Sequence, residues 1–536
     1  MTMTPNSFTV KGAKIIDGSG DEGFQGDVCV QNGRIQTISK TFIRDSIGKV
    51  IDGDNLVLAP GFIDMHSHSD LGVIADKAHL SKVTQGVTLE VVGQDGLSYV
   101  PTNDFVQAEL RAQLYGWNGS LNDKDWNFNS VGEYLREVDK GCAVNVAYLV
   151  PHGTVRMLIR GMDEGLSSPE DVKNMQAVIR TGMQEGAFGL SAGLTYFPAA
   201  YSDTNELIEL CKVVSEFGGY FSVHHRSYGA KVLEAIVECI EISSVSKAPL
   251  HLTHCHMGAP IYHGRAGELL ELLDAATEKG IDISLDTYPY LAGSSYLHVL
   301  LPSWVQSGGI EQLRTRLREP EIQRRVIQNL DHLGSDGNQG GVVNWDNIVI
   351  AGVERPENKG FVGCNISQLA KNYNKLGSQF YIDLVLSEDF KASVVVFGGN
   401  EENVRTIMKD RRHMVGTDGI LHGDRPHPRA YGTFARFLGH YSRDEKMFSL
   451  EGAINRMTGR PAKRLGLQDR GLVKEGYRAD LVLLDEEKVV DRATFESPRL
   501  PASGFEYVWI DGFPTLAKCD RTDLVPGKGL RKFDLN

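Results

Sequence analysis

The chain has 536 residues, of which 41% are hydrophobic and 23% are charged, and its formal net charge is −13. This composition is typical of a folded globular protein, and the length predicts one large domain with a smaller satellite. The acidic balance leaves no basic patch for a nucleic acid or an anionic membrane, so we expect neither as a partner.

The cysteine pattern and the N-terminus bear on the compartment. The seven cysteines are scattered and have no CxxC spacing, which predicts neither a disulfide framework nor a thiolate zinc finger. The first residues lack a charged segment followed by an apolar one, and no window holds the roughly 18 consecutive apolar residues that span a bilayer. We therefore expect a soluble, unprocessed, cytoplasmic protein.

Both ends of the chain predict short antiparallel strands. Residues 8–58 alternate apolar and polar positions between Gly and Asp turns, and the same texture returns in GLVKEGYRADLVLLDEE and FEYVWIDGFPT. Each segment needs the other to bury an apolar face, so we predict one small β-sandwich domain formed by residues 1–58 and 469–536.

Eight apolar runs rich in β-branched residues lie between these ends, and most are followed by a stretch with helical periodicity. Eight β–α units within residues 59–468 predict an α/β fold of the (β/α)8 TIM-barrel type, which carries its chemistry at the carboxyl ends of the strands. The runs end in GFIDMHSH, TLEVVGQDG, VNVAYLVPHG, FGLSAGL, YFSVHHR, LHLTHCH, ISLDTYPY and HMVGTDG.

Two segments between these runs carry signals of their own. Ser168 as N-cap, Pro169 at the first helical position and Asp171 three residues after the cap predict a helix that runs to Glu185. Residues 296–345 lack strand texture and exceed an ordinary connection, which favours a lid-like insertion over the barrel mouth. A peripheral helical pair without a substrate role is an equally weighted alternative.

Polar residues at the ends of the runs predict a metal site. His66 and His68 close the first run, and alternate residues of an extended strand point the same way, so both imidazoles can reach one ion. His224, His254 and Asp418 close the fifth, sixth and eighth runs, at the same face of the expected barrel. This ligand set suits one or two Zn²⁺ ions, and also Co²⁺, Mn²⁺ or Fe²⁺.

Asp95 closes the second run, in VVGQDG. Its carboxylate can bridge two metal ions. An ordinary Asp-Gly turn explains the same residues equally well.

These motifs together resemble the amidohydrolase superfamily and, more closely, the D-aminoacylase (N-acyl-D-amino-acid deacylase) family. The resemblance extends from about residue 8 to residue 534 and includes APGFIDMHSHSD, GVTLEVVG, PHGTVR, GLSAGLTYFPAAYSD, TYPYLAGSS, VGTDG, HPRAYGTFARFLG and GLVKEGYRADLVLLD.

The resemblance implies a ligand set for the metal. Asp95 stands where the family usually has a cysteine; a carboxylate keeps a negative bridging donor but is a harder ligand, which changes the metal preference. His225 is interpreted as structural, because adjacent residues on a strand point in opposite directions. The implied ligands are His66, His68, Asp95, His224, His254 and Asp418.

The resemblance also implies a substrate pocket. Arg429 matches the arginine that holds the substrate carboxylate, a task that suits the guanidinium fork. Tyr196, Tyr288 and Ser294 match further pocket positions, although residue statistics alone favour a surface arginine and packed tyrosines. His256 stands where the family commonly has a lysine, so a neutral imidazole would weaken the anionic anchor and favour a less acidic substrate.

The implied activity is hydrolysis of a linear amide, most closely an N-acyl-D-amino acid, to a carboxylate and a D-amino acid. The metal activates a water molecule, and Asp418 accepts its proton and returns it to the leaving amine. One alternative is a cyclic-amide hydrolase of the dihydropyrimidinase or hydantoinase type, which usually bridges its metals with a carboxylated lysine. Another is a non-catalytic scaffold that has lost the centre. The oligomeric state is left open.

Overall fold

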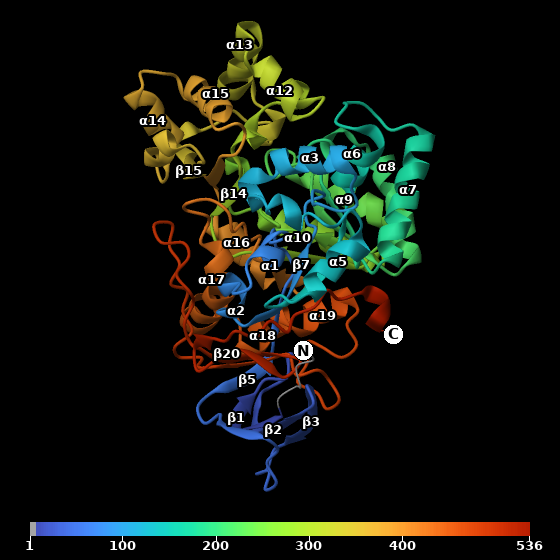
Figure 1. Ribbon diagram of the computed structural model, residues 1–536, viewed down its shortest axis with the longest axis vertical. Coiled ribbons are helices and arrows are strands. Elements are labelled where there is room, and N and C mark those ends of the chain that lie inside the picture. The colour runs from blue at the N-terminus through green and yellow to red at the C-terminus, as the bar shows by residue number, and fades with distance from the viewer. Residues whose placement is uncertain (1–6, 536) are drawn as a thin grey trace.

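The computed structural model describes residues 7–535, so residues 1–6 and 536 of the expected terminal domain lie outside it. The protein is an α/β structure with several sheets arranged along its long axis (Figure 1). A nine-stranded sheet forms one end, parallel strands with their helices form the middle, and a smaller α/β unit forms the other end. Within the described range no helix combines the length and the apolar character required to cross a membrane.

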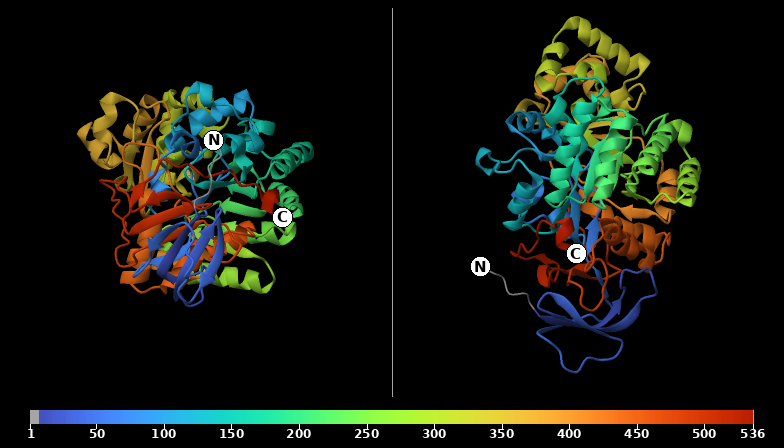
Figure 2. Two further views of the ribbon diagram at one scale, coloured as in Figure 1. Left: turned by 60° about the horizontal axis from the view of Figure 1, so that its bottom comes forward. Right: turned by 90° about the vertical axis from the view of Figure 1, so that its right-hand side faces the viewer.

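The nine-stranded sheet combines strands from both ends of the chain. Its order is β21-β20-β19-β18-β5-β1-β2-β3, with β4 beside β1, and the antiparallel pair β5–β18 joins the two ends. Figure 2 shows the N-terminal and C-terminal strands side by side at the same end of the molecule. The strands are β1 Phe8–Ile15, β2 Phe24–Gln31, β3 Arg34–Ser39, β4 Lys49–Asp52, β5 Val57–Pro60, β18 Leu481–Leu484, β19 Phe505–Ile510, β20 Phe513–Ala517 and β21 Asp520–Arg521.

Strand β18 is buried on both faces. Leu481 and Leu483 belong to the apolar cluster of the terminal sheet, whereas Val482 and Leu484 pack in a second cluster with Phe62 of the first parallel strand. Because side chains alternate along a strand, this double burial explains why the sequence reads LVLL instead of alternating with polar residues. The same strand therefore fixes the terminal sheet against the middle of the molecule.

The eight apolar runs predicted from the sequence all form parallel strands, and the third run forms two of them, β8 and β9. The strands lie in two sheets ordered β6-β7-β8 and β17-β13-β12-β11-β10-β9. Hydrogen bonds continue between the sheets: the Phe188 amide donates to the Tyr148 carbonyl at 2.9 Å, and the Met65 amide donates to the Val415 carbonyl at 3.2 Å. The strands are β6 Phe62–Asp64, β7 Val87–Val92, β8 Asn145–Tyr148, β9 Val150–Pro151, β10 Gly189–Gly193, β11 Tyr220–His224, β12 Leu250–Leu252, β13 Ile283–Thr287 and β17 His413–Val415.

Helices connect these strands, and the helix predicted after Ser168 is confirmed. Helix α7 (Pro169–Gln184) begins with a capping box, in which the Ser168 hydroxyl accepts the Asp171 amide, and Glu185 is its C-cap. The other helices of this part are α1 Gly72–Ala75, α2 Leu80–Val83, α3 Asp104–Gln113, α4 Tyr115–Asn118, α5 Val131–Asp139, α6 His152–Arg160, α8 Thr204–Glu216, α9 Val232–Ser246, α10 Ala266–Glu278, α16 Glu401–Lys409, α17 Arg429–Arg436, α18 Leu450–Met457 and α19 Gly459–Leu465.

Between β13 and β17 the chain forms a separate unit with its own apolar cluster, seen at the top of Figure 1. The helical segment expected at residues 296–345 covers only the first part of it. Two further apolar runs, IVIAG and SVVVF, pair antiparallel in a three-stranded sheet ordered β14-β16-β15. The elements are β14 Ala292–Tyr296, β15 Ile348–Gly352, β16 Ser393–Phe397, α11 Ser303–Gln306, α12 Ile310–Leu317, α13 Pro320–Gln328, α14 Ile366–Asn372 and α15 Gly377–Ser387.

Candidate metal centre

The carboxyl ends of five parallel strands, β6, β7, β11, β12 and β17, bring the predicted metal ligands together in the interior. Their donor atoms form two groups, and within each group one ligand atom from every residue lies within 4.8 Å of the others. The first group, called here group A, is His66, His68, Asp95 and Asp418. The second, group B, is Asp95, His224 and His254.

The spacing of the donor atoms in group A fits a zinc ion. His68 Nε2 lies 3.1 Å from Asp418 Oδ1, and His66 Nε2 lies 3.4 Å from His68 Nε2 and 3.7 Å from Asp418 Oδ1. Zinc–nitrogen and zinc–oxygen bonds are about 2.0–2.1 Å long, so two ligand atoms of a tetrahedral site lie about 3.3 Å apart.

Asp95 is shared by both groups. Its Oδ2 lies 3.3 Å from His254 Nε2 and 3.4 Å from His224 Nδ1, and its Oδ1 lies 3.6 Å from His66 Nε2. Oδ1 is buried and has no hydrogen-bond partner among the described residues. A buried acceptor without a partner is costly, and a bound cation would satisfy it. The donor set therefore fits a metal at both groups.

Asp95 also lies in a tight turn, the alternative interpretation of the Asp-Gly pair. The backbone φ angles of Asp95 and Gly96 are +54° and +71°. A Cβ atom at Gly96 would lie only 2.7 Å from the Gly193 amide nitrogen, which requires glycine there. The turn is what directs the Asp95 carboxylate toward the imidazoles.

Three candidate ligands have left-handed backbone conformations: φ is +54° at Asp95, +29° at His254 and +48° at Asp418. Such conformations are uncommon for non-glycine residues and cost about 1–3 kcal/mol each. Surrounding contacts hold them in place. The Asp418 amide donates to the His66 carbonyl at 2.8 Å, and the His254 amide donates to Asp286 Oδ1 at 2.9 Å.

The two carboxylates are held in the ionised form. Burial by itself would raise the pKa of Asp95, but the charges of His254, His66 and His224 outweigh it and hold that pKa well below its usual range. For Asp418 the same burial is outweighed chiefly by Arg429, so its pKa is also lowered. The site thus presents negative charge in a buried place, which a metal cation neutralises.

Arg429, Tyr288 and His256 lie together beside Asp418. The fully buried Arg429 places Nη1 2.8 Å from Asp418 Oδ2, and its guanidinium lies 4.4 Å from the centre of the Tyr288 ring. Nε and Nη2 of Arg429 have no hydrogen-bond partner among the described residues. The His256 ring centre lies 4.6 Å from that of Tyr288, and burial together with His254 and Arg429 lowers the pKa of His256 to about 3.

The other two predicted pocket residues make different contacts. Tyr196 lies beside group B, with its ring centre 4.7 Å from that of His224. Ser294 is half-buried in β14, where its hydroxyl donates to the Val394 carbonyl at 2.9 Å. His225 is buried, and its ring centre lies 3.7 Å from that of Tyr228.

Sequence reasoning did not identify several residues that surround the ligands. The Trp117 ring centre lies 4.5 Å from that of His68 and 5.1 Å from that of Tyr196, and Tyr228 lies 4.7 Å from His224. No motif pointed to these aromatic residues. Asp286 is different, because a carboxylate at the end of the seventh run, ISLDT, was a visible signal.

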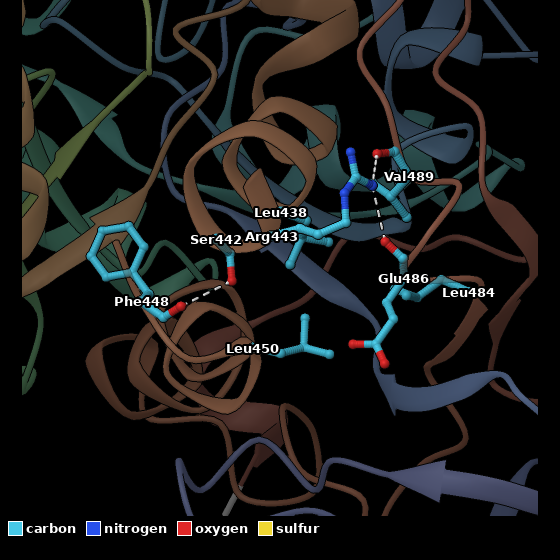
Figure 3. Close-up of a pocket in the computed structure, with 8 residues that line it drawn as sticks. All are labelled: Leu438, Ser442, Arg443, Phe448, Leu450, Leu484, Glu486 and Val489. Carbon is cyan, nitrogen blue, oxygen red and sulfur yellow. Dashed lines mark hydrogen bonds between the residues drawn. The ribbon is translucent and has the colours of Figure 1, made fainter. Parts of the chain in front are cut away.

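A cavity of about 100 Å³ lies elsewhere, between the segment around Leu438 and strand β18 (Figure 3). Two of its polar side chains are engaged: Arg443 donates to the carbonyls of Glu486 and Val489, and the Ser442 hydroxyl donates to the Phe448 carbonyl. It shares no lining residue with groups A and B.

The chain is similar to known proteins over most of its length. The profile described as "Amidohydrolase family" matches residues 49–332 and 368–515. The chain is 33% identical to the D-aminoacylase of Alcaligenes xylosoxydans xylosoxydans over 513 residues, which cover 95% of this chain and 94% of that protein.

Two solved structures are similar over nearly the whole length. A D-aminoacylase structure superposes with a TM-score of 0.80 at 30% identity and covers 98% of this chain and 99% of its own. N-acyl-D-glutamate deacylase from Bordetella bronchiseptica, solved with zinc and a phosphonate mimic of the tetrahedral intermediate, has a TM-score of 0.82 at 27% identity and covers 99% and 100%.

The chain belongs to the amidohydrolase family. Within that family it is similar, from end to end, to D-aminoacylase and to N-acyl-D-amino-acid deacylases.

Proposed function

We propose that this protein hydrolyses the amide bond of N-acyl-D-amino acids at a zinc centre, releasing a carboxylate and a D-amino acid. The observation that carries the proposal is the position of Arg429, which places a carboxylate-binding side chain 2.8 Å from Asp418 of group A. A metal cluster beside a buried arginine suits a substrate that carries an amide next to a carboxylate. The names and full-length similarity of the relatives support the same substrate class.

The residues of groups A and B would hold the metal. His66, His68 and Asp418 would bind one ion, His224 and His254 a second, and Asp95 would bridge them. When bound, zinc lowers the pKa of water and polarises the amide carbonyl.

The protein's own side chains supply the remaining chemistry. The two oxygens of Asp418 face His68 and Arg429, so Asp418 stands where it can accept a proton from the attacking water and return it to the leaving nitrogen. Arg429 orients the substrate through its carboxylate. Trp117 and Tyr196, whose rings lie against His68 and His224, exclude bulk water from these ligands.

The pocket favours an uncharged amino-acid side chain. His256 takes the place of the family's lysine, and the rings of Trp117, Tyr196 and Tyr228 surround the ligand histidines. Aromatic walls stabilise apolar groups. Arg429 then serves as the anchor for the substrate's single carboxylate.

We also infer the domain organisation. The hydrogen bonds that continue between the two parallel sheets support a closed (β/α)8 barrel within residues 59–468. The shared apolar cluster of strands β1–β5, β18 and β19 supports a β-sandwich domain of residues 1–58 and 469–536. The insertion between β13 and β17 begins at β14, where the Ser295 hydroxyl accepts the Trp117 indole at 3.2 Å. This contact supports a role of the insertion as a lid over the site.

The cyclic-amide alternative has less support. The fourth apolar run, which forms β10, ends in LSAG without a lysine, and Asp95 already stands between the two groups. A scaffold without a centre would not be expected to keep six converging ligand side chains.

Substrate profiling tests the proposal. Purified protein loaded with zinc is assayed against N-acetyl-D- and N-acetyl-L-methionine, N-acetyl-D-aspartate, N-acetyl-D-glutamate, hydantoin and dihydrouracil, and its zinc content is measured. We expect preferential hydrolysis of N-acetyl-D-methionine. Cleavage confined to the cyclic amides would favour the hydantoinase alternative, and absence of both bound zinc and hydrolysis would favour the scaffold.

A further inference from the structure

A buried cluster of charged side chains lies under group A. Lys82 of α2 and the carboxylates of Asp64 and Glu90 are all 0% exposed. Lys82 Nζ lies 2.5 Å from Asp64 Oδ2 and 3.4 Å from Glu90 Oε2. Removing three charges from water is costly, so such a cluster requires close pairing.

The first arm of this cluster joins the two loops that carry His66 and Asp418. Asp64 Oδ1 accepts the amide of Thr417 at 2.8 Å and that of His66 at 3.2 Å. The Thr417 hydroxyl donates to Asp64 Oδ2 at 2.6 Å and accepts from Lys82 at 3.0 Å. Lys82 thus binds the Asp64 carboxylate and the Thr417 hydroxyl, which set the position of both loops.

The second arm reaches the residues on either side of His68. Glu90 lies 2.7 Å from His79 Nε2 and accepts the Ser69 hydroxyl. Ser69 Oγ in turn lies 2.7 Å from Ser67 Oγ. Lys82 therefore compensates both carboxylates through which the loops of group A are held.

Group B is held by different contacts. The His254 amide donates to Asp286, whose other oxygen lies 2.9 Å from His251 Nε2, and His224 lies 2.7 Å from the Thr195 hydroxyl. Lys82, Asp64 and Glu90 take no part in these contacts. Asp286 Oδ2 also lies 3.8 Å from His66 Nδ1, so Asp286 touches both groups, whereas the Lys82 cluster contacts only the loops of group A.

We propose that Lys82 is a positioning residue that acts through Asp64, Thr417 and Glu90 to set the affinity of group A for its metal ion without setting that of group B. The inference rests on the metal centre proposed above. Residues that orient ligands commonly change metal affinity about 10–100-fold when they are replaced.

Zinc titration of the metal-free full-length protein tests the inference. The variant Lys82→Met/Glu90→Gln removes one cation and one anion together, which limits unpaired buried charge. Thr417→Val is a milder change that removes the hydroxyl shared by Lys82 and Asp64. We expect the wild-type chain to bind two zinc ions. In the double variant the second ion should bind with about 10–100-fold lower affinity. Thr417→Val should shift the same ion in the same direction by less.

The matched control is Arg470→Met, which breaks another buried ion pair, with Asp480. It should lower the unfolding midpoint and leave both zinc affinities at their wild-type values. Two tight ions in both folded test variants would overturn the inference, as would an equal loss of affinity at both groups. A wild-type protein that binds no zinc would instead overturn the proposed function.

Discussion

The two ends of the parallel strands differ in how their buried charges are satisfied. At the carboxyl ends, Asp95 Oδ1 and two guanidinium nitrogens of Arg429 lack partners among the described residues, and three candidate ligands have left-handed backbones. At the amino ends, Asp480 pairs with Arg470 and also accepts the Asn145 side chain at 3.3 Å and the Asp511 amide at 2.7 Å.

This contrast separates function from stability within one set of strands. Unsatisfied polar atoms and strained backbones persist where a ligand will complete them, whereas the paired network around Asp480, which contacts no candidate ligand, serves the folded state. If the two parallel sheets close into the proposed barrel, the carboxyl ends carry the chemistry and the amino ends carry stability. Substitutions at the carboxyl ends should therefore change activity, and substitutions at the amino ends should change the free energy of unfolding.

Asp418→Asn should give the largest effect. The amide cannot accept the proton, so kcat/KM is expected to fall about 10²–10⁴-fold. Steady-state hydrolysis of N-acetyl-D-methionine measures the loss, and metal analysis checks that zinc remains bound. Activity close to wild type with zinc retained would remove Asp418 from its proposed role.

Arg470→Met tests the amino ends. It leaves Asp480 buried without its charged partner, so the free energy of unfolding should fall by about 3–5 kcal/mol, while kcat and KM stay unchanged. Urea denaturation measures this change. The exposed Arg492→Met is the control, expected within about 0.5 kcal/mol of wild type. A fall in kcat without a change in stability would contradict the division of roles.

Glu206 tests a fully paired charge at the carboxyl ends. It lies 2.7 Å from His152, which directly follows β9, and also pairs with Arg156. Burial alone would raise its pKa, but His152 and Arg156 outweigh it and lower the pKa of Glu206 to about 2. Ionised Glu206 therefore contributes stability fully above about pH 4.5, and that contribution is lost as the pH falls toward 2.

The free energy of unfolding should fall by about 3 kcal/mol when this contribution is lost. Urea midpoints of the metal-free wild type and of Glu206→Gln are measured from pH 7 to pH 3. The comparison separates the contribution of Glu206 from protonation of the candidate metal ligands, which is common to both proteins. The difference between the two proteins should shrink below pH 4.5. A constant difference would show that Glu206 is not held ionised by its partners.

Ser168→Ala should give the smallest effect, because α7 lies outside both ends of the strands. Loss of the capping hydroxyl should destabilise the protein by about 1 kcal/mol without changing activity. Lys173→Ala, on the exposed face of the same helix, is the control. Equal unfolding midpoints for the two variants would mean that the cap contributes nothing.

Local patterns predicted the strands and the polar side chains that the structure brings together, because apolar β-branched runs and the polar residues that end them are contiguous in sequence. The same reasoning missed β15 and β16, whose runs IVIAG and SVVVF resemble the apolar runs of the parallel strands although they pair antiparallel. It also missed Lys82, since its role depends on Thr417, 335 residues away. Contacts of that range leave no periodicity to detect.

Asp95 has a further consequence, which concerns oxidation. The family's usual cysteine would place a thiolate in the centre, and thiolates are oxidised to sulfenic and higher acids. In this chain both groups carry only nitrogen and oxygen donors. Peroxide and thiol-modifying reagents therefore find no ligand to attack, so the centre should keep its metal under oxidising conditions that would inactivate a thiolate-bridged relative.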